Sequence, residues 1–133
     1  MDVDSNVVTL HSILTEGPVL MVTWVLWSSH AIRELDDLKP YYDEFESMGV
    51  QLLAISQDRR RSVPRVKPFA LNRGWQYTIL LDPENLIREL YNLQAMPTSM
   101  IIDQRGEILF TFVGYQSGDE EILFDELRYF FGG

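Results

Sequence analysis

The chain has 133 residues, 46% of them hydrophobic and 23% charged, a length and balance that fit one compact domain with one core. Its 20 acidic residues outnumber its 11 lysines and arginines, and the resulting net charge of −9 argues against binding to the phosphate backbone of nucleic acids. Because no apolar run reaches the roughly 18 residues of a membrane-spanning helix, we expect a single soluble domain over residues 1–133 with no membrane span.

The first half of the chain alternates between apolar and amphipathic segments. Residues 19–25 are apolar and rich in β-branched side chains, which predicts a buried strand. A helical pattern follows over residues 29–48, and Pro40 removes a backbone donor inside it, so we expect a kink near residues 36–39. Residues 50–56 then predict a second buried strand.

The second half continues this alternation as far as residue 91. Ser62 is suited to cap a helix that continues to residue 72. Residues 77–81 predict a third strand, and the Asp-Pro-Glu-Asn sequence at residues 82–85 predicts a turn into a short helix.

The C-terminal part reads as a hairpin followed by a helix. Residues 99–102 and 107–113 have strand character and flank a loop that contains glycine, so these strands should pair antiparallel. Residues 119–131 place Ile122, Leu123, Leu127 and Phe130 on one side of an amphipathic helix. The pattern predicts a three-layer α/β/α sandwich with a mixed, mostly parallel central sheet and a C-terminal β-hairpin plus helix.

Ligands of such folds bind at the carboxyl ends of the strands. The loops at residues 26–30, 57–61 and 93–97 are therefore the expected place of a functional site. The first of these lies within residues 23–35, Thr-Trp-Val-Leu-Trp-Ser-Ser-His-Ala-Ile-Arg-Glu-Leu. This segment resembles the thioredoxin-superfamily pattern Phe-Trp-Ala-Thr-Trp-Cys-x-x-Cys-x-x-Glu. Further features follow in order: Val-Gln-Leu-Leu-Ala-Ile-Ser, Leu-Leu-Asp-Pro-Glu, Met-Pro-Thr, Ile-Ile-Asp-Gln-Arg-Gly and Val-Gly-Tyr. The combination is most similar to the TlpA/ResA-like branch of the thioredoxin-like thiol-disulfide oxidoreductases.

The departure from this family falls on the two residues that carry its chemistry. The first cysteine of the family, whose thiolate is stabilised at a helix N-terminus, corresponds to Ser28. The second, which resolves the mixed disulfide, corresponds to Ala31. The chain contains no cysteine at all, so we expect it to be redox-inactive as written, with no catalytic residue at these vestigial positions.

Other chemistry at this loop has weaker support. His30 lies two residues after Ser28, but the glycines of a nucleophile elbow are missing, so an exposed histidine is the better interpretation than a catalytic base. His11 is the only other histidine, which argues against a metal site, and nothing in the sequence calls for a cofactor.

The resemblance also assigns roles around the vacant positions. It makes Glu34 the former proton relay beneath the dithiol, with an exposed helix acid as the alternative. It makes Pro97 a cis-proline and implies that Trp27, Met96, Pro97 and Gly114 border a shallow apolar groove for an extended peptide. Ordinary core packing of Trp27 is an equally good interpretation.

A basic run stands out in the acidic chain. Arg59, Arg60 and Arg61, with Arg65 and Lys67 nearby, follow the end of the second predicted strand. A solvated loop face is the common explanation of such runs, and contact with an acidic partner or a phosphate is the alternative.

Two functional interpretations therefore lead. The chain is either a family member whose cysteine pair was replaced, by nature or by engineering, or a naturally non-catalytic thioredoxin-fold module that binds peptides or serves as a scaffold. If the source gene encodes Ser28 and Ala31, engineering is excluded. The family resemblance favours the bacterial envelope or periplasm, with the signal or anchor absent from this chain, and a protein or peptide as the partner.

Overall fold

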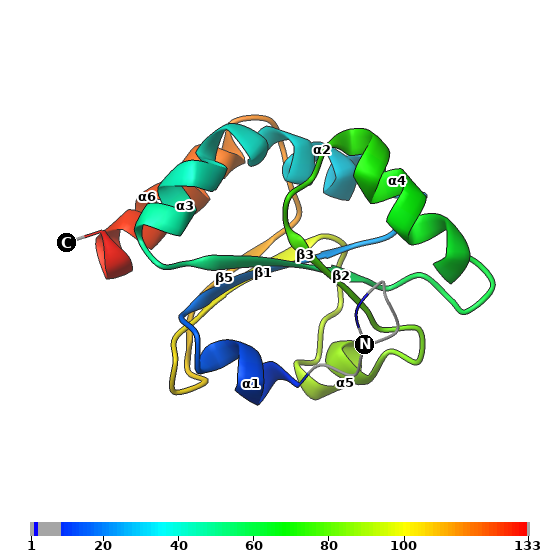
Figure 1. The fold of residues 1–133 in the computed structure, drawn as a ribbon, viewed down its shortest axis with the longest axis horizontal. Coiled ribbons are helices and arrows are strands. Elements are labelled where there is room, and N and C mark those ends of the chain that lie inside the picture. The colour runs from blue at the N-terminus through cyan, green and yellow to red at the C-terminus, as the bar shows by residue number, and fades with distance from the viewer. Residues whose placement is uncertain (1, 3–8, 133) are drawn as a thin grey trace.

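The computed structural model describes residue 2 and residues 9–132, and a five-stranded mixed sheet forms its centre (Figure 1). The strand order is β3-β2-β1-β4-β5. β1, β2 and β3 are parallel, whereas β4 runs antiparallel to both β1 and β5. The strands are β1 (Val19–Trp24), β2 (Gln51–Ser56), β3 (Thr78–Leu81), β4 (Thr98–Ile102) and β5 (Ile108–Val113).

Helices cover both faces of the sheet and give the fold three layers. Figure 1 shows α2, α3, α4 and α6 on one face and α1 and α5 on the other. This arrangement confirms the predicted α/β/α sandwich with its terminal hairpin and helix. The helices are α1 (Leu10–Leu14), α2 (Ser29–Asp37), α3 (Tyr42–Ser47), α4 (Val66–Arg73), α5 (Leu86–Leu90) and α6 (Asp119–Phe131).

The core lies on both sides of the sheet because side chains alternate along each strand. Leu20 and Val22 of β1 belong to the cluster that also holds Leu35 of α2, whereas Val19 and Met21 belong to the cluster on the opposite face. A strand that is buried on both faces is mostly apolar, and this explains the nearly continuous apolar run that predicted β1; its buried Thr23 is paired with the backbone of Thr98.

The disruption expected near residues 36–39 is confirmed: the helical pattern of residues 29–48 is divided into α2, a 3₁₀ turn at Lys39–Tyr41 and α3, because Pro40 cannot continue the hydrogen bonding of α2. Two other local features differ from the sequence-based expectation. The Ser62 side chain does not cap the next helix; its Oγ accepts a hydrogen bond from Arg65 instead. The helix α1 was not predicted, and the Thr9 side chain caps it.

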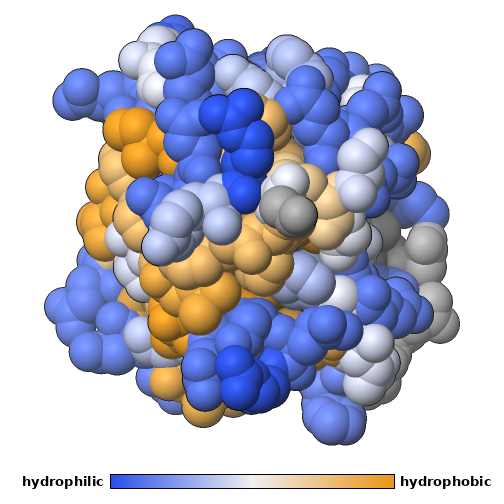
Figure 2. Space-filling view, turned by 90° about the vertical axis from the view of Figure 1, so that its left-hand side faces the viewer, coloured by the Kyte–Doolittle hydropathy of each residue, from blue (hydrophilic) through white to orange (hydrophobic). Residues whose placement is uncertain are grey.

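The surface of α6 also differs from the expectation. Leu123 and Leu127 are buried as predicted, but Ile122 is 42% exposed and Phe124 packs against the core instead. Tyr129 is 80% exposed, so it is not part of the core. Figure 2 shows the end of the molecule where α6 terminates, and there apolar surface lies across the middle with polar residues above and below it.

Candidate functional site

A cavity of about 590 Å³ lies where β1 and β2 end, and all three loops that the sequence singled out contribute to its wall. The loop after β1 supplies Trp27, the loop after β2 supplies residues 57–59 and 61, and the loop before β4 supplies residues 93–96. Asn85 and Arg88, at the start of α5 and within it, were not predicted as site residues and complete this side of the wall. The strand ends therefore form the concave site expected of an open α/β sheet.

The two vestigial cysteine positions lie at the start of α2, and neither lines the cavity. Ser28 is the N-cap of α2, and its Oγ accepts a hydrogen bond of 3.3 Å from the backbone N–H of Ala31. Ala31 is fully buried. These are the ordinary structural roles of a helix-capping serine and a core alanine, and with no cysteine in the chain neither step of thiol–disulfide exchange can occur.

A serine nucleophile finds no support at this position. His30 is exposed, and no hydrogen bond joins it to Ser28. Within the described residues, no side-chain base contacts the Ser28 hydroxyl. An unactivated serine hydroxyl is a weak nucleophile, so this geometry does not form a catalytic pair.

Glu34 is completely buried beneath the start of α2, which makes the exposed-acid interpretation wrong. Ser99 of β4 donates a hydrogen bond of 2.7 Å to Glu34 Oε2, and Oε1 has no hydrogen-bond partner among the described residues. Burial raises the pKa of Glu34 from 4.5 to about 8, against the lowering effect of the Ser99 hydrogen bond. Glu34 is therefore largely a neutral acid at pH 7, held between the helix and the sheet.

The loop before β4 is held by two hydrogen bonds at the peptide group that follows Pro97. The Met96–Pro97 peptide bond is cis, and the carbonyl of the buried Pro97 accepts a 2.8 Å hydrogen bond from the N–H of Gly114. The backbone N–H of Thr98 donates to Thr23 Oγ at 2.8 Å. Gly114 adopts φ of +80°, a conformation that suits glycine. These contacts fix the position of Met96.

Met96 and Trp27 face the same cavity from two different loops. Trp27 is 81% exposed, so the interpretation that it packs in the core is wrong. The backbone N–H and C=O of the half-buried Met96 make no hydrogen bond within the described part of the chain. Of the four residues expected to border a groove, Trp27 and Met96 line the cavity, whereas Pro97 and Gly114 support the loop that carries Met96.

Asp58 is a site residue that the sequence reasoning missed. Its carboxylate is buried and accepts hydrogen bonds from the Leu26 N–H at 3.1 and 3.2 Å and from Ser56 Oγ at 2.8 Å. Asp58 thereby ties the loop after β2 to the loop after β1. Its place directly after an apolar strand was the available signal, because polar groups at strand ends commonly serve the site.

Three buried side chains of the described residues carry polar atoms without a hydrogen-bond partner, and one of them lines the cavity. The side-chain amide of Gln57, which lies in the cavity wall, has no hydrogen-bond partner at either atom within the described residues. Trp24 Nε1, in the last residue of β1, and Glu34 Oε1 are also unpartnered. Each such group costs about 1–3 kcal/mol, and the amide of Gln57 is the one that a ligand in the cavity could satisfy.

Two classes of site are not formed by the part of the chain that the structure describes. It contains no group of three or more histidine or acidic side chains placed to hold a metal ion. None of its helices has both the length and the apolar character needed to cross a lipid bilayer.

Comparison with known proteins gives a consistent family assignment. The sequence pattern of the AhpC/TSA family matches residues 1–111. A thiol-disulfide oxidoreductase ResA from Bacillus thuringiensis is 23% identical over 119 residues, which cover 90% of this chain and 67% of that protein. The chain thus spans about two thirds of the length of this curated relative.

Solved structures share the fold at low sequence identity. The crystal structure of the peroxidoxin BcpB from Mycobacterium tuberculosis has a TM-score of 0.84 at 18% identity, covering 96% of this chain and 89% of that one. StoA from Bacillus subtilis has a TM-score of 0.70 at 23% identity, covering 85% of this chain and 83% of that one. These likenesses establish the thioredoxin-like fold.

Proposed function

The chain belongs to the AhpC/TSA family, and on that premise we propose that it is a redox-inactive, thioredoxin-like module that binds an extended peptide segment in the cavity at its strand ends. Residues 1–133 act as one domain in this proposal. Family relatives carry the name thiol-disulfide oxidoreductase ResA, and this chain has no thiol with which to perform such an exchange. Binding without turnover is the function that remains for the site.

One observation carries the proposal, the pairing of an exposed tryptophan with a free backbone segment. Trp27 offers an apolar platform that is 81% exposed in the cavity wall. The unpaired N–H and C=O of Met96 are available to a strand-like peptide laid along the same wall. Main-chain hydrogen bonds and alternate side-chain contacts are the two elements of peptide recognition by β-augmentation.

Calorimetric titration with a short, unstructured, uncharged peptide whose apolar residues alternate with glutamine tests this proposal. We expect saturable binding that Trp27→Ala weakens about tenfold, because a buried aromatic anchor typically contributes more than about 1 kcal/mol. Tyr129→Ala is the matched control, because Tyr129 is 80% exposed and lies on α6 outside the cavity. No binding, or equal losses in both variants, would overturn the proposal.

The compartment is also a proposal. From the resemblance to the ResA-like proteins we propose that the domain works in the bacterial envelope or periplasm. Fractionation of source cells with an antibody against the domain should place it in the envelope fraction. Recovery in the cytoplasmic fraction alone would contradict this assignment.

A further inference from the structure

Arginines surround the cavity in a chain whose net charge is −9. Arg59 and Arg61, from the loop after β2, and Arg88, from α5, all contribute to the wall. Among the described lining residues Asp58 is the one carboxylate, and its oxygens are already held by Leu26 and Ser56. The cavity is therefore a positively charged region on an acidic protein.

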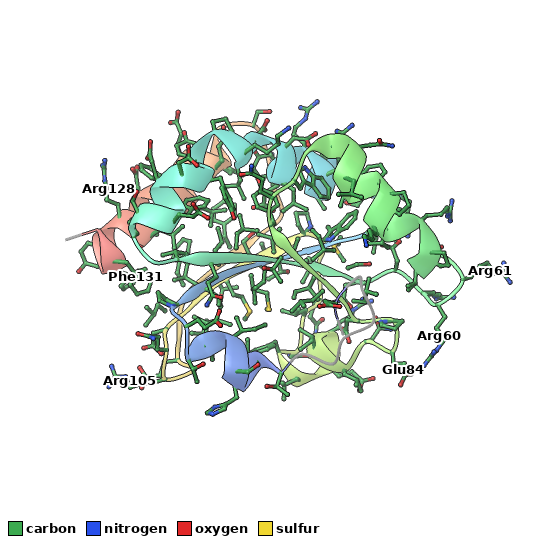
Figure 3. All side chains as sticks on the ribbon, viewed as in Figure 1. Arg60, Arg61, Glu84, Arg105, Arg128 and Phe131 are labelled. Atoms are coloured by element: carbon green, nitrogen blue, oxygen red, sulfur yellow. The ribbon has the colours of Figure 1, made fainter. Side chains whose placement is uncertain are left out.

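The three consecutive arginines of this loop differ in what they contact. Arg60 forms an ion pair with Glu84, and Figure 3 shows its side chain directed toward that residue. Arg59 and Arg61 make no side-chain hydrogen bond or ion pair within the described residues, and Arg61 extends freely from the loop in Figure 3. Two of the three guanidinium groups are therefore available to a ligand.

The backbone donors around the cavity are less available than the arginines. Asp82 accepts hydrogen bonds from the backbone N–H groups of Leu86, Ile87 and Arg88, at 2.8, 3.1 and 3.2 Å. These donors at the start of α5 are therefore not available to a ligand. The Leu26 N–H is likewise engaged, because it donates a hydrogen bond to the Asp58 carboxylate. Because these backbone amides are occupied, the guanidinium groups are the main donors left for an anionic ligand, and a peptide carboxylate pairs well with a guanidinium.

Resting on the proposed peptide-binding function, we propose that the cavity selects acidic peptide segments. A carboxylate side chain of the peptide pairs with Arg59 or Arg61 while a neighbouring residue lies along Met96 and Trp27. Arg88 adds to the positive field, and its Nε donates to the carbonyl of Leu93 at 3.3 Å. The basic run thus contributes to peptide selection in addition to its role as a solvated loop.

Fluorescence anisotropy with two labelled peptides tests this selection. The peptides share one sequence of alternating apolar residues and differ only in carrying glutamate or glutamine between them. We expect the glutamate peptide to bind about fivefold to tenfold more tightly at low ionic strength, and the difference to shrink at high salt. If neither peptide binds, the peptide-binding function itself fails; if both bind equally, only the acidic selection fails.

Charge-removal variants locate the effect. Arg59→Gln combined with Arg61→Gln should abolish the preference for glutamate, so that the variant binds the glutamate and glutamine peptides with nearly equal affinity. Arg105→Gln is the matched control, because Figure 3 shows Arg105 at the opposite end of the molecule from Arg61. An equal loss in this control, or displacement of the glutamate peptide by inorganic phosphate at matched ionic strength, would overturn the selection proposed.

Discussion

Ser99 Oγ donates a 2.7 Å hydrogen bond to Glu34 Oε2, and both residues are fully buried. The contact joins β4 to α2 directly below the vestigial cysteine positions. Glu34 belongs to the pattern that the chain shares with its redox-active relatives, but in this chain it has no thiol to serve. We therefore expect replacement of Glu34 or Ser99 to change the stability of the folded protein.

Replacing Glu34 with glutamine should change how stability depends on pH. The folded-state pKa of about 8 lies above the ordinary value of 4.5, so the proton is bound more tightly in the folded state. The contribution of neutral Glu34 is fully present below about pH 4.5 and is lost as pH rises through 8. Urea titration measures the free energy of unfolding of both proteins. As pH rises across this window, the value for the parent protein should fall relative to that of Glu34→Gln by up to about 1.4 kcal/mol per pH unit.

Glu107→Gln is the control for this experiment, because Glu107 is exposed and carries the same chemical change. The Glu107→Gln variant keeps Glu34, so its stability should still fall with rising pH as in the parent protein. Parallel curves for the parent protein and Glu34→Gln would mean that Glu34 is already charged in the folded protein near neutral pH.

Ser99→Ala should destabilise the protein and raise the pKa of Glu34 further. The substitution leaves both oxygens of a buried carboxyl group without a partner, at a cost of about 1–3 kcal/mol. The hydrogen bond from Ser99 lowers the pKa of Glu34, so its loss acts in the upward direction. Urea unfolding at pH 6 measures the first effect, and an NMR titration of the Glu34 side chain measures the second. An unchanged titration would show that the hydrogen bond is not formed in solution.

The sequence predicted the sheet well because each strand carries its own signal. Residues 19–25 are apolar except for Thr23, and a strand covered on both faces favours that pattern. In contrast, α1 has five residues, too few for a helical period to stand out, and its cap depends on one contact between Thr9 and Ser12. The equally short α5 was predicted because the Asp-Pro-Glu-Asn turn precedes it, whereas α1 has no such signal.

The site was predictable in position but not in detail. The loops at the strand ends follow from topology, but the contact between Asp58 and the Leu26 N–H joins residues 32 positions apart, and no local pattern encodes it. Trp27 and Glu34 had opposite outcomes, one exposed and one buried, although both lie in the same motif. Burial of a single side chain depends on what packs over it, and this is a property of the tertiary structure.

Trp27→Ala and Trp75→Ala should differ strongly in stability. Trp27 is 81% exposed, so its removal should change the free energy of unfolding by less than about 0.5 kcal/mol. Trp75 is 6% exposed, packs edge-on against Trp24 and donates its Nε1–H to Asp36 at 2.8 Å. Its replacement should cost about 3–5 kcal/mol. Urea unfolding measures both, and a large loss for Trp27→Ala would mean that this side chain packs in the core in solution.

Installing Ser28→Cys together with Ala31→Cys should restore thiol–disulfide chemistry. A thiol at the N-cap of α2 lies where the helix dipole stabilises a thiolate, and a thiol at the buried position 31 is shielded from outside reagents. We expect an intramolecular disulfide in the oxidised form and catalysis of insulin reduction, with Ser28→Cys alone inactive as the control. Circular dichroism verifies that each variant is folded. A folded double variant without activity would show that the loss of redox function extends beyond these two side chains.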